Sequence, residues 1–157
     1  MAKITYREGN ALDISNIYRL FEAEQKQIEI PFPLMNPKKT VAYIAAALLD
    51  GVVVVADLDG RIKGAVVGAP VKPPWSDLWV LDIPFLVVDP HFRQHGVAQH
   101  LIQAVKEWAA DKKLPVWVEA LTGGKSALLK DRFIAMQGLT YMGGRFLLWP
   151  KDLPARG

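Results

Sequence analysis

The order of apolar and polar positions divides the chain into short segments of two kinds. Apolar residues spaced three or four positions apart predict helices, and alternating or continuous β-branched runs predict strands. Helical stripes begin near Asn10, Asn36 and Gly96, and a fourth helix is predicted at Ser126–Gln137. Strands are predicted at Lys3–Arg7, Val52–Asp57, Arg61–Ala69, Leu78–Val88, Leu114–Leu121, Leu139–Met142 and Arg145–Trp149.

Capping and turn residues support these boundaries. Asn36 followed by Pro37 is typical of a helix start. Asp59-Gly60 between two β-branched runs predicts a tight hairpin. Pro84 lies inside the longest predicted strand, where it removes one ladder hydrogen bond and favours a bulge or a sheet edge.

The predicted order of elements is β-α-α-β-β-β-α-β-α-β-β. This order indicates a mixed α/β (α+β) fold with a partly antiparallel sheet, in which the piece from Leu78 to Leu121 is a parallel crossover. The chain has 157 residues, of which 51% are apolar and 22% charged. That composition is typical of a packed protein, and we expect one domain over residues 1–157.

Charge and cysteine content exclude several classes of function. Nineteen Lys and Arg against sixteen Asp and Glu give a net charge of +3, spread along the chain, and no cysteine is present. A nucleic-acid binder concentrates its positive charge on one face, so we expect no nucleic-acid partner. No apolar run is long enough for a membrane span, and the first residues lack the layout of a secretion signal. We therefore expect a cytoplasmic protein without a membrane partner.

Metal chemistry is not expected. Without cysteine there is no thiolate ligand and no cysteine nucleophile. His91 and His95 have i,i+4 spacing, but they span a predicted loop, and no HExxH pattern accompanies them or His100.

The segment Phe85–Ala98 is the one that suggests chemistry. A buried strand ends at Val88, and a helix begins near Gly96. The first N–H groups of a helix have no internal acceptor and lie at the positive end of its dipole, so this junction can bind an anion such as a phosphate pair. Gly96 would let the backbone approach the anion closely. From these residues alone, a glycine that merely serves a tight turn is an equally good interpretation.

The pattern Arg93-x-x-Gly96-x-Ala98, preceded by Val88-x-Pro90, resembles the acetyl-CoA motif of the GCN5-related N-acetyltransferases (GNAT). The element order is also similar to that fold over most of Ile4–Trp149. The resemblance implies a GNAT-like acyl-CoA N-acyltransferase fold with acetyl-CoA as cosubstrate. It also implies which residues contact the cosubstrate: the backbone of Gln94, His95, Gly96, Val97 and Ala98 at the pyrophosphate, Arg93 in support, Leu86, Val87 and Val88 beside the pantetheine arm, and Ser126 at the start of the last helix.

The same resemblance suggests a catalytic base. An alkylamine has a pKa of about 10.4, so on the order of one molecule in a thousand is nucleophilic at neutral pH. A carboxylate or an ordered water must therefore accept a proton. Asp82 occupies the position at which many members of the family carry a glutamate base. The alternative is a strand aspartate that faces solvent or caps a neighbour.

Two positions depart from the family pattern. Ile134 stands where members often have the tyrosine that protonates the leaving thiolate, and Ala127 stands where an asparagine commonly contacts the coenzyme. Tyr141 is a substitute proton donor, although a hairpin tyrosine that only packs is an open alternative.

The sequence therefore predicts an N-acetyltransferase that uses direct attack by a primary amine of a small molecule, peptide or protein. A catalytically silent acyl-CoA-binding domain with a regulatory or interaction role is the alternative. An acetyltransferase toxin acting on aminoacyl-tRNA is a third hypothesis, but it needs a basic face that the composition does not show. Candidate walls of the acceptor site are Ile28–Met35 and Val71–Trp79, and dimers are frequent in the family, which leaves a homodimer open.

Overall fold

The described part of the chain folds around a five-stranded sheet in the order β1-β2-β3-β4-β5. The computed structural model describes residues 3–28, 33–119, 127–142 and 147–154, with the backbone alone for residues 127–131. The strands are β1 (Thr5–Glu8), β2 (Val52–Leu58), β3 (Arg61–Val71), β4 (Val80–Val88) and β5 (Val116–Val118). Neighbouring strands are antiparallel except β4 and β5, which are parallel and connected through a helix, as predicted.

Four α-helices accompany the sheet in the described part of the chain. They are α1 (Ile14–Gln25), α2 (Pro37–Asp50), α3 (Val97–Asp111) and α4 (Ala127–Met136), with short 3₁₀ turns at Ala11–Asp13 and Pro90–Phe92. The predicted start of α2 is confirmed, because the Asn36 side chain accepts a hydrogen bond from the N–H of Lys39 at 3.1 Å. The hairpin at Asp59-Gly60 is confirmed too, with positive φ at both residues.

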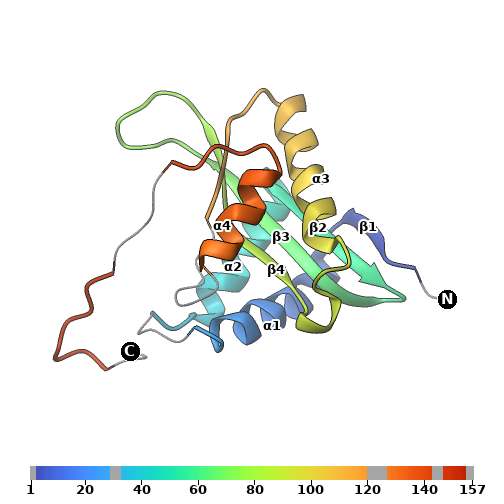
Figure 1. Ribbon diagram of the computed structural model, residues 1–157, viewed down its shortest axis with the longest axis horizontal. Helices are drawn as coiled ribbons and strands as arrows, with labels where there is room; N and C mark the ends of the chain where they lie inside the picture. Colours follow the sequence, from blue (N-terminus) through green and yellow to red (C-terminus); the bar gives the residue numbers. More distant parts are fainter. Residues whose placement is uncertain (1–2, 29–32, 120–126, 143–146, 155–157) are drawn as a thin grey trace.

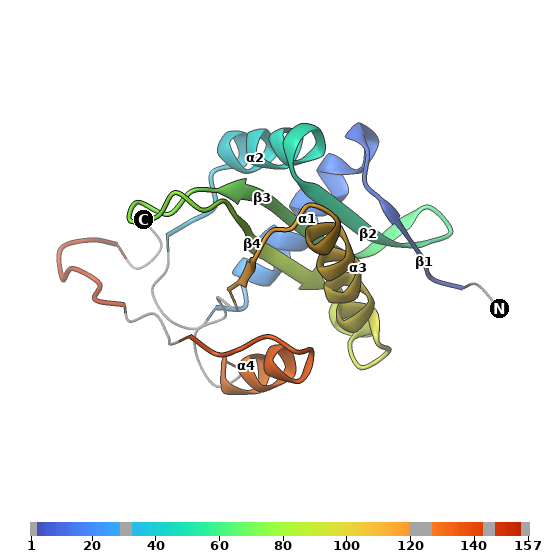
Figure 2. The same ribbon diagram turned by 90° about the horizontal axis from the view of Figure 1, so that it is seen from above.

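The helices cover both faces of the sheet (Figures 1 and 2). Val53 and Val55 of β2 pack toward α1 and α2, whereas Val52 and Val54 pack toward α3. Because successive side chains of a strand point to opposite faces, a strand covered on both sides is apolar throughout. This explains the continuous valine run of β2.

A bulge in β4 decides which face carries Asp82. Val67 of β3 is opposite Phe85, and Ala69 is opposite Asp82, so β4 has one extra residue between the two pairs. The bulge predicted from Pro84 is thereby confirmed. Ile83 packs toward α3, but Phe85 packs toward α1 and α2, so the extra residue exchanges the faces. Asp82 therefore faces the α1/α2 side.

The end of the chain differs from the prediction. The described residues of the two expected closing strands, 139–142 and 147–149, form no strand, and residues 143–146 lie outside the described part. Residues 147–154 lie away from the sheet in both views (Figures 1 and 2), and Tyr141 and Met142 are 62% and 76% exposed. An apolar pattern alone does not make a strand, because a strand also needs the edge of a neighbouring strand to pair with.

The strand predicted at Leu114–Leu121 is shorter, and residues 120 and 121 lie outside the described part. Within the described residues, none of the helices is long and apolar enough to cross a membrane.

Candidate functional site

The loop between β4 and α3 presents a set of backbone N–H groups. The φ angles of Gln94 and Gly96 are +68° and +75°, and α3 begins directly afterwards at Val97. The first N–H of the helix to reach a carbonyl is that of His100, which donates to Gly96 O at 3.1 Å. The N–H groups of residues 97–99 therefore have no acceptor among the described residues, and they lie at the positive end of the α3 dipole.

The sequence of the loop keeps this end of the helix accessible. A Cβ on Gly96 would lie 3.7 Å from His100 Nδ1, an ordinary contact, so its positive φ rather than crowding favours glycine. The Asp89 carboxylate accepts a hydrogen bond from the N–H of His91 at 2.9 Å, and the N–H of Asp89 donates to Lys63 O at 2.8 Å. These bonds hold the loop against β3, so the N–H groups are fixed before any anion binds.

Arg93 is directed toward α1 rather than toward the helix end. Its guanidinium donates to the carboxylate of Glu24 at 2.8 Å, with 42% and 22% of the two side chains exposed. Sequence reasoning did not identify Glu24, because nothing in a helical pattern shows which loop a surface carboxylate will meet. The pair connects the loop to the end of α1.

One edge of β4 has no strand beside it within the described residues. β5 pairs with β4 only as far as Ile83, whose carbonyl accepts from the N–H of Glu119 at 3.4 Å. Leu86, Val87 and Val88 pair with β3 on their other side. Their backbone groups on the β5 side could therefore pair with an extended ligand, as the resemblance implies.

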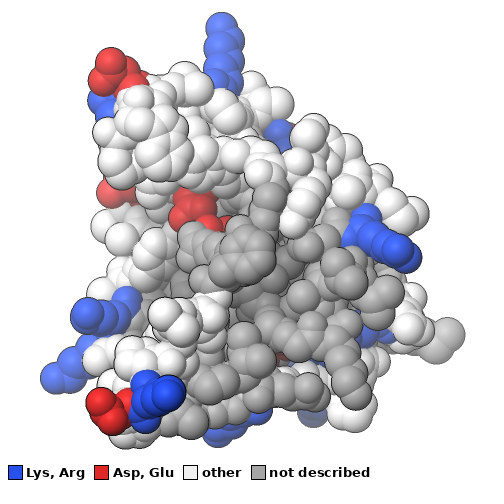
Figure 3. Space-filling view, turned by 60° about the vertical axis from the view of Figure 1, so that its left-hand side comes forward, with Lys and Arg blue, Asp and Glu red and all other residues white. Residues whose placement is uncertain are grey.

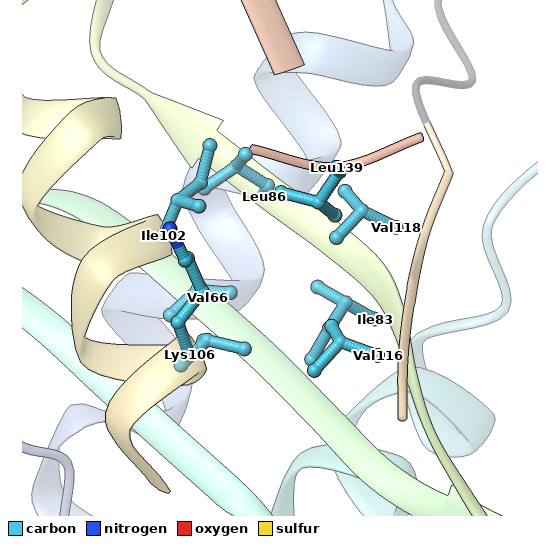
Figure 4. A pocket seen from close by; sticks show the side chains of 9 residues that line it. Val66, Ile83, Leu86, Ile102, Lys106, Val116, Val118 and Leu139 are labelled. Carbon is cyan, nitrogen blue, oxygen red and sulfur yellow. The ribbon is translucent and has the colours of Figure 1, made fainter. Parts of the chain in front are cut away.

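A small apolar cavity lies beside this edge, on the α3 side of the sheet. Its volume is about 10 Å³, and Figure 4 shows Leu86, Leu139 and Val118 together at one end of it. The remaining lining residues are Val66, Ile83, Ile102, Val105, Lys106 and Val116. Leu139 is held there by the preceding residues, since Lys106 Nζ donates to Gln137 O at 2.8 Å. The cavity shows where β4 and β5 separate.

Asp82 has aromatic neighbours on the α1/α2 side. Trp117 of β5 is its Cα partner in the parallel pair, so the two side chains point to the same face. Trp75, in the β3–β4 connection, stacks on Trp117 with ring centroids 6.2 Å apart. On α2, the Tyr43 ring lies edge-on to Phe85 at 5.8 Å. Figure 3 shows acidic side chains set back among uncharged ones on the side that carries the β3–β4 connection.

The charge of the Asp82 carboxylate affects the pKa of Tyr43. Burial, and then the negative charge of Asp82, raise the pKa of Tyr43 to about 12. Sequence reasoning missed Tyr43 and Trp117. Tyr43 is not among the apolar positions that the helical pattern turns inward, and Trp117 follows the pattern of a core strand residue.

The remaining predicted residues have no contact with the site that the described part of the chain shows. Tyr141 is 62% exposed and makes no hydrogen bond within the described part of the chain, so its role as a proton donor stays a prediction. Ser126 lies outside the described residues, and the side chain of Ala127 is not described. Ile134 is half-buried on α4. Among the described residues, no three His, Asp or Glu side chains form a group that could hold a metal ion.

Comparison with known protein families decides the assignment. The acetyltransferase (GNAT) family matches residues 16–128, which extend from within α1 to beyond β5 and include the loop after β4. The chain belongs to the GNAT family. No curated protein matches the sequence.

Solved GNAT structures share the fold at low sequence identity. A predicted acetyltransferase from Clostridium acetobutylicum with acetyl-CoA has a TM-score of 0.76 and 16% identity, covering 93% of this chain and 96% of the other. An aminoglycoside N-acetyltransferase in complex with CoA has a TM-score of 0.71 and 17% identity, covering 98% and 97%. An aminoglycoside acetyltransferase from an uncultured soil metagenomic sample, in complex with trehalose, has a TM-score of 0.68 and 20% identity, covering 94% and 97%.

Proposed function

We propose that this GNAT chain is an acetyl-CoA-dependent N-acetyltransferase that acetylates a primary amine by direct attack. The observation that supports the proposal best is the set of N–H groups after Gly96, which have no acceptor among the described residues. They follow β4, the strand that contains both the unpaired edge and Asp82. Solved relatives contain CoA or acetyl-CoA, which supports the same cosubstrate here. The fold class and the family follow from the comparisons, whereas the roles of single residues belong to this proposal.

The described residues fit acetyl-CoA in two ways. The N–H groups of residues 97–99 and the loop of Gln94, His95 and Gly96 can hold a diphosphate through backbone hydrogen bonds. The edge of Leu86, Val87 and Val88 can pair with an extended amide-containing arm. Bound there, acetyl-CoA supplies a thioester carbonyl, at which a C–N bond forms and the C–S bond breaks.

Asp82 would take the proton from the amine. Its backbone lies four residues before Leu86, where the unpaired edge of β4 begins, and the bulge turns its side chain toward the α1/α2 face. A carboxylate there holds the ammonium form first and then accepts its proton, directly or through water. Without a cysteine, a thioester intermediate on the protein is excluded, so the amine attacks within a ternary complex.

The acceptor of this enzyme would be an amine, as the aminoglycoside acetyltransferases among the solved neighbours suggest. Glu119 is a second carboxylate in this region. It follows Trp117 by two residues and by alternation lies on the same face, and its N–H bonds to Ile83 O.

A silent acyl-CoA-binding domain remains the second candidate, and one observation favours it. Ile134 replaces the usual acid, and Tyr141 is exposed. The loss does not by itself stop catalysis, because a thiol has a pKa of about 8.5 and is a tolerable leaving group.

Acetyl-CoA binding tests the cosubstrate site. We expect acetyl-CoA to raise the melting temperature of the wild type, and Gly96→Glu to abolish that rise, because a carboxylate would stand before the N–H groups. Gly96→Asn is the matched control, since asparagine tolerates the positive φ without a charge. Equal shifts in the wild type and Gly96→Glu would contradict the site.

Acetyl transfer then separates an enzyme from a silent binder. We expect Asp82→Asn to lower kcat by roughly 100-fold or more while acetyl-CoA binding is retained. Asp111→Asn, at the exposed end of α3, is the control and should keep kcat within a few-fold. Full transfer activity in Asp82→Asn would exclude Asp82 as the base, and transfer to no amine by the wild type would favour the silent domain.

A further inference from the structure

The Tyr43 hydroxyl is a buried polar group without a hydrogen bond. Tyr43 Oη has no partner among the described residues, although its ring packs against Phe85, which in turn stacks on Phe21 at 4.3 Å. A buried tyrosine hydroxyl normally has a partner, because leaving one unsatisfied is costly. With its pKa raised to about 12, Tyr43 stays neutral at physiological pH, and its oxygen can accept a hydrogen bond.

Asp82 lies on the face of the sheet against which Tyr43 packs, because its neighbour Ile83 points to the α3 side and Phe85 packs against the Tyr43 ring. The carboxylate raises the pKa of Tyr43, yet Asp82 does not accept the O–H, since Oη has no hydrogen-bond partner in the described structure. An ammonium group has three N–H donors. One such group between the two side chains could donate to the Asp82 carboxylate and to Tyr43 Oη at the same time.

Indole rings adjoin the same position. Trp117 is the strand partner of Asp82, and Trp75 stacks on it at an interplanar angle of 30°. Trp75 is 78% exposed, so much of its surface is available to a ligand. In the described part of the chain, Lys side chains lie over the rings of Phe92, Trp79 and Trp108, and none lies over Trp75 or Trp117. No described Lys side chain therefore competes with a ligand for the faces of these two rings.

We propose that the acceptor is a primary amine carried on a flat, apolar body, with its ammonium group between Asp82 and Tyr43 and its body against Trp75 and Trp117. This inference rests on the proposed function, of which it specifies the acceptor class. A polyhydroxylated amine fits the surface poorly, because its hydroxyls would be desolvated against rings that cannot bond them. Tyr43 is a positioning residue here, since it orients the amine while Asp82 takes the proton.

The preference among amines tests the proposal directly. We expect kcat/KM for 2-phenylethylamine to exceed that for glucosamine, a polyol amine of similar size, by roughly tenfold or more. 2-Cyclohexylethylamine, which is apolar but not flat, should fall between them. Trp75→Ala should reduce the preference for the flat amine. An equal rate with glucosamine, or a preference for it, would overturn the proposal.

Tyr43→Phe tests the hydrogen bond. We expect KM for the amine to rise roughly 3- to 10-fold with kcat nearly unchanged, the cost of one hydrogen bond. The melting temperature should stay the same or rise, because the variant removes an unsatisfied hydroxyl. Tyr18→Phe is the matched control, since Tyr18 Oη already bonds to Glu22 at 2.9 Å on α1. An unchanged KM in Tyr43→Phe would refute the role of Tyr43.

Amine binding measured by calorimetry separates this proposal from the proposed function. If acetyl-CoA stabilises the protein but 2-phenylethylamine neither binds nor reacts, the acceptor class is wrong and the cosubstrate site stands. If acetyl-CoA does not bind but 2-phenylethylamine binds with an affinity that Trp75→Ala lowers, the proposed function fails and the amine site stands.

Discussion

Replacing Gly68 with alanine tests whether the register of β4 positions Asp82 to accept the proton of the amine. A Cβ on Gly68 would lie 2.7 Å from the Asp82 carbonyl oxygen and would also meet the Ile83 side chain. Ordinary contact begins at 3.4 Å, so β4 must move by about 0.7 Å at this point. The Ile83 side chain can adjust at its far end, but the carbonyl belongs to the backbone, so Asp82 moves with it.

The size of the effect follows from this displacement. Overpacking of this kind costs about 1–3 kcal/mol, which for a domain of this length lowers Tm by about 2–4 °C per kcal/mol. A misplacement of 1 Å can cost about 100-fold in rate, so a shift of about 0.7 Å predicts a loss in kcat of roughly tenfold. We expect the KM for acetyl-CoA to change little, because the N–H groups of α3 do not depend on this contact.

Gly64→Ala is the matched control on the same strand. There the Cβ would meet Val97 Cγ1 at 2.8 Å, at the first residue of α3. We expect a similar loss of Tm, but with a higher KM for acetyl-CoA and a nearly unchanged kcat. Steady-state kinetics at a temperature at which both variants are folded measures this difference. If Gly68→Ala loses stability but keeps the wild-type kcat, the position that strand register gives Asp82 does not determine the rate of transfer.

Two further predictions concern ion pairs. Glu24→Gln should tighten acetyl-CoA binding by roughly 1.5- to 5-fold in calorimetry, since it frees Arg93 from a half-exposed pair for the phosphates. Glu22→Gln, which affects the Glu22–Lys26 pair on the same helix, should leave affinity unchanged, and a weaker affinity in Glu24→Gln would contradict the reasoning. Hydrogen bonds from Arg7 lower the pKa of the buried Asp13. Stability from this lowered pKa is present above the unfolded value of about 3.9 and is lost as pH falls through the folded value. Asp13→Asn should therefore cost about 1.5–3 kcal/mol at pH 7, and urea unfolding should show the gap to wild type narrowing below about pH 4. A gap independent of pH would exclude the charge as its source.

The sequence by itself determined most elements and the loop after β4. Asn36, Asp59-Gly60 and Gly96 act through local backbone geometry, which neighbouring residues largely fix, so their helix start, hairpin and helix entry were predictable. The bulge at Pro84 was predictable for the same reason, because a missing N–H perturbs its own strand.

Only the tertiary structure decided what surrounds Asp82. The extra residue in β4 turns the carboxylate to the α1/α2 face, and pairing with β5 brings Trp117 beside it. Tyr43 comes from a helix nearly forty positions earlier in the chain, and Glu24 meets Arg93 across 69 positions. Such contacts depend on how layers pack and strands register. Local pattern does not encode either of these, and the described residues of the two predicted closing strands, which form no strand, show the same limit.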